Sequence, residues 1–331
     1  MKSISKLGIG PMSTEVIESV FRYSEENSEP LMLIASKNQI DWDDGYVNNW
    51  NTKQYSQYIG KLRKKYPEAR VYLCRDHCGS GFKNDGIDDV YKTIDSDLEN
   101  GFDLIHVDFC HLKNKDKILE ESKRAIEYIK QKSPDTLIEV GTDENTGVLL
   151  NDISRIEEQM KFFSDLTPIN FFVAQTGSLV KEINQVGKFN QEFISKIRKI
   201  ADKYQFNLKE HNADYIGSEE IRKRTGLIDA INVAPQYGVI QTKLTLEKCL
   251  NYGIDFTDFI NTAYESSRWR KWLLYNTAEN KFLCSVIAGH YVFASDAYKN
   301  ICEKINRHED FMETVIQEMM KNFKMYLDNL K

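Results

Sequence analysis

The sequence predicts an α/β fold, a (β/α)8 TIM barrel with a C-terminal helical extension, and three observations support this. Short apolar runs alternate with amphipathic helical stretches, which is typical of parallel βαβ units. About eight such units fit within roughly 250 residues, the usual size of this barrel. Polar side chains follow nearly every apolar run, where the active sites of such barrels lie.

Each expected strand is a short run rich in β-branched and apolar residues, and the expected helices lie between these runs. The strands are expected at 7–10, 30–35, 70–74, 102–108, 136–140, 169–174, 207–210 and 230–233. The helices are expected at 14–25, 52–65, 86–100, 115–132, 153–164, 190–204 and 218–225. Ser13 is well suited to cap the first helix, because its hydroxyl can accept from a free backbone N–H.

A doubly wound open sheet is the competing architecture. It is disfavoured because no glycine-rich nucleotide fingerprint follows the first strand. Residues 255–331 lose the strand–helix rhythm and keep helical periodicity, with Phe311, Val315, Met319 and Phe323 at four-residue spacing. We therefore divide the chain into a barrel over 1–254 and a helical extension over 255–331.

Composition excludes several classes of function. The net charge of -6 gives no basic footprint for nucleic acid. No apolar run is long enough to cross a membrane, and no secretory signal is visible at the start. The six cysteines lack paired zinc-knuckle spacing, so we expect free thiols and a cytoplasmic protein.

The most informative segment is the strand that runs into Asp76 and His77, followed by Cys78 and Gly79. Successive side chains of a strand point to opposite faces, so we expect one of the two to bind a metal and the other to move a proton. The alternative is a capped strand end with a hydrogen-bonded core histidine.

Polar groups that follow the other strands should converge on the same mouth. Imidazoles and carboxylates there can bind a divalent metal, which would polarise a carbonyl and stabilise an enediolate. Besides Asp76, the expected catalytic carboxylates are Asp108 and Asp143. The expected substrate contacts are Lys37, Asn38, Asn212, Asp214 and Asn232.

The remaining histidines and lysines have less specific surroundings. His106 lies inside an expected strand, and His290 and His308 lie in the helical extension, so we interpret all three as structural. A metal-free Schiff-base aldolase would need a lysine such as Lys37 or Lys209, and the sequence disfavours it.

Six short segments, taken in order, resemble one protein family. They are Ala35-Ser36-Lys37-Asn38-Gln39, Asp76-His77-Cys78-Gly79, Ile105-His106-Val107-Asp108, Gly141-Thr142-Asp143, Gln175-Thr176-Gly177 and His211-Asn212-Ala213-Asp214-Tyr215. In this order and spacing, over most of the chain, they resemble the accessory subunits of tagatose-bisphosphate aldolase, a family related to class II, metal-dependent ketose-bisphosphate aldolases.

The resemblance implies a ligand set for a divalent metal, which we expect to be zinc. It assigns His77, Glu139 and His211 to the metal, places Gln175 where those aldolases have a third histidine, and makes Asp76 the acid/base group. Two departures concern the substrate. Asn212 to Tyr215 replace a phosphate-binding Gly-Gly-Ser, and Asp214 among them would repel a phosphate. Asp143 stands where the accessory family usually has a glutamate, one methylene longer.

These features predict a metal-dependent, class II aldolase-like enzyme. Its substrate would be an open-chain ketose, phosphorylated or acidic, undergoing retro-aldol cleavage or C4 epimerisation. The alternative is a non-catalytic accessory subunit that stabilises a separate tagatose-bisphosphate aldolase, so its partner would be that catalytic subunit or a second copy of the chain. A third hypothesis is a sugar-binding protein without turnover.

Overall fold

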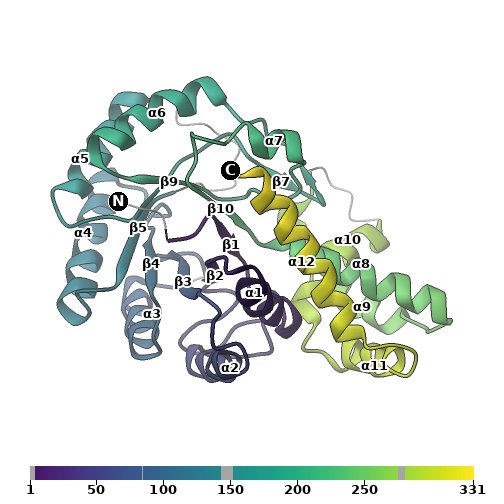
Figure 1. Ribbon diagram of the computed structural model, residues 1–331. Coiled ribbons are helices and arrows are strands. Elements are labelled where there is room, and N and C mark those ends of the chain that lie inside the picture. The colour runs from purple at the N-terminus through teal and green to yellow at the C-terminus, as the bar shows by residue number, and fades with distance from the viewer. Residues whose placement is uncertain (1–3, 84, 143–151, 275–279) are drawn as a thin grey trace.

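Eight parallel strands close into a barrel in the computed structural model, which describes residues 4–83, 85–142, 152–274 and 280–331 (Figure 1). Around the barrel the strands follow the order β1-β10-β9-β6-β5-β4-β3-β2. Their bounds are β1 (Leu7–Ile9), β2 (Leu31–Ser36), β3 (Val71–Cys78), β4 (Leu104–Val107), β5 (Leu137–Gly141), β6 (Phe171–Val173), β9 (Asn207–Glu210) and β10 (Ala230–Val233). The predicted fold class is confirmed, and each expected strand forms.

Helices fill the connections between strands, as the periodicity predicted. They are α1 (Thr14–Asn27), α2 (Thr52–Lys65), α3 (Ile87–Glu99), α4 (Lys115–Lys132), α5 (Ile153–Ser164), α6 (Gln191–Tyr204) and α7 (Ser218–Arg222). Ser13 caps α1 as expected, because its hydroxyl accepts from the backbone N–H of Val16 at 3.1 Å. A short hairpin, β7 (Val180–Lys181) and β8 (Asn184–Gln185), follows β6 and was not predicted.

Strand alternation separates two apolar layers. Side chains of one parity fill the barrel interior, and those of the other parity pack against the helices. The interior layer consists of Met32, Ile34, Cys74, Leu104, Phe171 and Ala230. Above it the interior becomes polar, with buried Lys209, Glu139 and Asn232.

Beyond β10 the chain is helical, as expected. The elements are α8 (Pro235–Tyr252), α9 (Thr257–Glu265), η1 (Arg270–Trp272), α10 (Lys281–Ala288), η2 (Gly289–Val292), α11 (Asp296–Ile305) and α12 (Phe311–Asn329). Helices α8 to α11 project to one side, and α12 returns to pack along α1 and α7 (Figure 1). The four-residue stripe of α12 that begins at Phe311 is buried, so it is core. No helix in the described ranges combines the length and apolar character needed to cross a membrane.

Candidate metal centre at the barrel mouth

The backbone of β3 is irregular where it reaches the mouth. Its pairing with β4 shifts register between Arg75 and Cys78, and His77 adopts a left-handed φ of 49°. This bulge breaks the alternation of the strand. Asp76 and His77 consequently face the same cavity, with Asp76 Oδ2 and His77 Nε2 3.9 Å apart. The expectation that they point to opposite sides was wrong, because it assumed a regular strand.

Glycine is needed directly after this bulge. At Gly79 a Cβ atom would lie 1.6 Å from the carbonyl oxygen of Asp108, so a side chain there would push β3 away from β4. The small residue therefore holds the end of β3 against the loop that carries Asp108.

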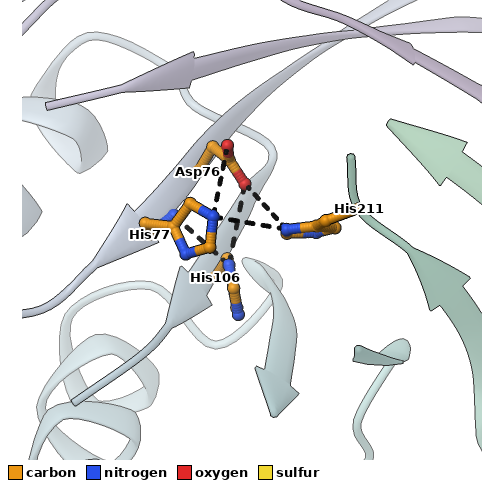
Figure 2. A group of neighbouring side chains, drawn as sticks. All are labelled: Asp76, His77, His106 and His211. Atoms are coloured by element: carbon orange, nitrogen blue, oxygen red, sulfur yellow. Dashed lines mark hydrogen bonds and ion pairs between the residues drawn. The ribbon is translucent and has the colours of Figure 1, made fainter. Parts of the chain in front are cut away.

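Four side chains from three strands converge beside the bulge. They are Asp76 and His77 from β3, His106 from β4, and His211 from the residue after β9 (Figure 2). Each offers one ligand atom, and these atoms all lie within 4.8 Å of one another. We call these four residues the metal cluster.

Each histidine of the metal cluster is held through its outer ring nitrogen. His77 Nδ1 lies 2.8 Å from Asp108 Oδ2, His106 Nε2 lies 2.8 Å from the Gly141 carbonyl oxygen, and His211 Nε2 lies 2.8 Å from Glu139 Oε1. These partners are acceptors, so the outer nitrogens carry the protons. The inner nitrogens, His77 Nε2, His106 Nδ1 and His211 Nδ1, face one another, and His77 Nε2 lies 3.4 Å from His211 Nδ1. Outer partners of this kind orient histidines that bind a metal.

The inner nitrogen of His106 has a further contact. His106 Nδ1 accepts the backbone N–H of His77 at 3.2 Å, which ties β4 to the bulge of β3. This contact confirms that Nδ1 is the unprotonated nitrogen of His106.

Asp76 is the acidic member of the metal cluster. Its Oδ1 lies 3.6 Å from His211 Nδ1 and 3.7 Å from His106 Nδ1, and this buried oxygen has no hydrogen-bond partner among the described residues. Burial alone would raise the pKa of Asp76, but the His77, His211 and His106 imidazoles outweigh burial and hold the pKa well below its usual range. Asp76 is therefore ionised and lacks a donor.

The pKa of His77 shifts in the opposite direction to that of Asp76. Burial would lower its pKa, yet the carboxylates of Asp76 and Asp108 outweigh burial and raise the pKa of His77 to about 9. In the same pair, burial is outweighed by the His77 hydrogen bond, which lowers the pKa of Asp108 to about 2. Without a cation at the centre, His77 carries the positive charge that balances these two carboxylates.

The donor set and the orphaned oxygen fit a divalent cation. Three imidazoles and one carboxylate are ligands that suit zinc and neighbouring transition metals. A cation among them would take up the unpaired Asp76 Oδ1, which otherwise carries a desolvation cost. The residues present therefore meet the requirements of a metal centre.

Glu139 was predicted to be a metal ligand, but it lies outside the metal cluster and contacts it through His211. Its Oε2 accepts from Lys209 Nζ at 2.6 Å and its Oε1 accepts from His211, so it joins the two side chains. Burial opposes ionisation of Glu139, but Lys209 and the nearby imidazoles lower its pKa to about 2. Lys209 is thus engaged in a buried ion pair, and Lys37 is likewise buried and paired with Asp85.

The third imidazole belongs to a histidine that the sequence did not assign to the site. His106 was interpreted as structural, and the structure places it in the metal cluster. Gln175, expected to replace a third histidine, instead lines a different cavity of about 290 Å³ between β4–β6 and α4–α6. The sequence did contain one signal for His106. It lies two residues before Asp108, and residues two apart in a strand face the same side.

Of the predicted substrate contacts, two line the mouth cavity and a third, Asp214, caps a helix. Asn38 and Asn212 line the cavity at the mouth together with Asp76 and His77. Asp214 accepts from the backbone N–H groups of Ala234 and Gln236 at the start of α8, and burial raises its pKa to about 7.

Two predicted residues remain. Asn232 lies inside the barrel beside Gly8, where a Cβ would sit 2.2 Å from Asn232 Oδ1, and its amide has no partner among the described residues. Asp143 lies outside the described residues.

The mouth cavity encloses about 510 Å³ and has a second wall from the C-terminal extension. Arg268, Lys271, Trp272, His290 and Tyr291 belong to this wall. Sequence reasoning did not assign any of them to the site, because no motif marks them and they lie far along the chain from the strands.

Comparisons with known proteins agree on the fold. No protein-family model and no curated protein matches the chain. Among solved structures, it resembles a probable tagatose 6 phosphate kinase from Sinorhizobium meliloti 1021, with a TM-score of 0.75, 14% identity and coverage of 98% of this chain and 92% of that one.

Two further solved structures carry the name aldolase. Fructose-bisphosphate aldolase from Campylobacter jejuni gives a TM-score of 0.63 at 13% identity, covering 99% of this chain and 90% of that one. The YdjI aldolase from Escherichia coli K12 gives 0.54 at 15% identity, covering 92% and 90%. At such identities these likenesses establish the shared barrel fold.

Proposed function

We propose that the chain is a divalent-metal-dependent enzyme of the class II aldolase type, which cleaves or epimerises an open-chain ketose carrying a phosphate or a carboxylate. The observation that carries this proposal is the metal cluster, in which all three histidines are anchored through their outer nitrogens. A purely structural core would not require three such anchors around an unpaired carboxylate oxygen. The aldolase names among the structural neighbours support the same class.

The roles of the residues follow from their positions. His77, His106 and His211 would hold the ion, and we propose zinc because imidazole nitrogens dominate the donor set. When bound, the ion would supply a Lewis acid that polarises a ketose carbonyl. Asp76, ionised and unpaired at Oδ1, would exchange a proton with the substrate. Asn38 and Asn212, which line the cavity, would bind sugar hydroxyls.

The first test measures metal content and turnover. Protein purified without a metal-binding tag should contain about one zinc per chain, and the double variant His77→Ala with His211→Ala should lose it. A screen of fructose 1,6-bisphosphate, tagatose 1,6-bisphosphate and tagaturonate should then show cleavage or C4 inversion that stops in chelator. The proposal would be overturned if the purified protein contained no metal and its thermal stability did not change on addition of zinc or chelator.

Asp76→Asn separates proton transfer from metal binding. The variant should keep its metal and lose turnover, because the amide can still contact a cation but cannot take a proton. Loss of the metal would instead make Asp76 a ligand. A protein that holds its metal, turns over no ketose and raises the activity of a co-expressed aldolase would favour the accessory role.

A further inference from the structure

Three residues of the second wall of the mouth cavity come from a short segment between α9 and α10. Residues 268–272, which we call the strap, place Arg268, Lys271 and Trp272 on the cavity lined by Asp76 and His77. The strap belongs to the helical extension, so it reaches the barrel mouth from outside the strand–helix units.

Three anchors hold the strap in place. Trp269 is 3% exposed and packs in a cluster with Cys284 and Ile287 of α10. The indole N–H of Trp272 donates to the hydroxyl of Tyr291 at 3.1 Å. The carbonyl oxygen of Trp272 accepts from the backbone N–H of Glu182, in the hairpin that follows β6, at 2.6 Å. The strap is therefore a fixed element of the wall.

The two cations of the strap are exposed and lack acidic partners. Within the described ranges, neither Arg268 nor Lys271 forms an ion pair with a carboxylate. Their charged ends lie over aromatic rings instead. Arg268 Cζ is 5.2 Å from the Tyr291 ring centre and Lys271 Nζ is 4.9 Å from that of Trp272. Rings position a cation without neutralising it.

We propose that Arg268 and Lys271 form an anion subsite, which binds the phosphate or carboxylate end of the ketose while its carbonyl end lies at the metal cluster. This inference rests on the proposed function and names the group that the site recognises. Guanidinium and ammonium groups both donate to oxyanions, and two unneutralised cations match one terminal anion.

The charge distribution also sets the orientation of the substrate. The carboxylate of the partly buried Asp76 repels an anionic group, whereas the exposed cations of the strap, on the same cavity, attract it. A ketose with one charged end would therefore enter with its anion at the strap. Ser36, Asn38 and Asn212 line the same cavity, beside the place where the hydroxyls of the sugar would lie.

The test compares charged and uncharged sugars on matched variants. Binding of fructose 6-phosphate, fructuronate and fructose is measured by calorimetry, on the protein as purified and again in chelator. The variants are Arg268→Gln and Lys271→Met. The control is Arg270→Gln, an exposed arginine on the same turn that does not line the cavity.

We expect each strap variant to weaken binding of the preferred anionic sugar by roughly tenfold, the size of one lost charge-assisted contact. The control should leave it unchanged, and fructose should bind weakly to every form. Preference for fructose 6-phosphate would assign a phosphate, and preference for fructuronate would assign a carboxylate.

Equal binding of fructose and both anions, or equal losses in Arg268→Gln and Arg270→Gln, would overturn the inference. Because the measurement in chelator needs neither metal nor turnover, its outcome is independent of the first test. Binding at the strap by a protein that holds no metal would overturn the proposed function alone.

Discussion

The two walls of the mouth cavity are built in different ways. On the strand wall, His106 and His211 are buried, Asp76 and His77 are partly buried, and the histidines are held by partners such as Asp108 and Glu139. On the strap wall, Arg268 and Lys271 are exposed and rest on aromatic rings. The difference separates two tasks. Bond-making chemistry needs fixed geometry, which the closed sheet supplies, whereas recognition of a charged end tolerates an appended segment.

The largest expected effect is on the strand wall, from His106→Ala. Loss of one of three imidazoles should weaken metal binding by more than about 100-fold, beyond the effect usual for an outer partner. Gln175→Ala should leave metal affinity unchanged, because Gln175 lines a different cavity. Competition with a fluorescent zinc chelator measures both. His308→Ala, at an exposed histidine stacked on Tyr252, controls for the substitution itself. A His106→Ala protein with full affinity would reduce His106 to a support for the bulge at His77.

Asp108→Asn should have a smaller effect on the same wall. It removes the carboxylate that fixes the tautomer of His77, and such outer partners are worth roughly 10–100-fold in metal affinity. The pKa of His77 should fall, since Asp108 is one cause of its elevation. The same chelator competition, repeated from pH 6 to 9, tests this. Unchanged affinity at every pH would show that His77 is oriented without Asp108.

His290 makes the strap wall sensitive to acid. Burial, with Lys271 and Arg268 nearby, lowers its pKa to about 3, whereas an unfolded histidine titrates near 6.5. Between these values the unfolded chain binds a proton that the folded chain excludes, so stability is fully present above about pH 6.5 and falls as the pH drops.

The free energy of unfolding should be about 2 kcal/mol lower at pH 5 than at pH 7.5, as measured by urea unfolding. His290→Gln, which cannot titrate, should show a correspondingly smaller loss between these two pH values. Tyr46, which contacts His290, does not contribute, because burial raises the pKa of its hydroxyl well above this range. An identical pH dependence in the variant and the native protein would refute a role for His290.

The smallest effect should come from Trp272→Phe. The change removes the hydrogen bond to Tyr291 and keeps most of the ring under Lys271, so binding of the anionic sugar should weaken only about threefold. Metal affinity should be unchanged, which distinguishes the strap wall from the strand wall. Trp42→Phe, at a tryptophan outside the cavity, is the matched control. A parallel loss of metal would show that the two walls are coupled.

Much of the fold could be predicted from local patterns. Apolar runs and helical stretches repeat with their own periods, so α2, α4 and α5 have the bounds that periodicity predicted. The hairpin of β7 and β8 was missed because its strands are too short to show a period. The packing of α12 against the barrel helices was also missed, since an apolar stripe predicts a buried face but not the element that covers it.

The sequence by itself determined the barrel and the mouth at which Asp76, His77 and His211 gather, and it predicted a metal-binding chemistry for them. Only the tertiary structure decided that His106 completes the cluster and that the strap lines the cavity. The bulge at His77 rotates one side chain out of the regular alternation, and the extension folds back across many residues. Both depend on contacts between distant segments, which local periodicity does not encode.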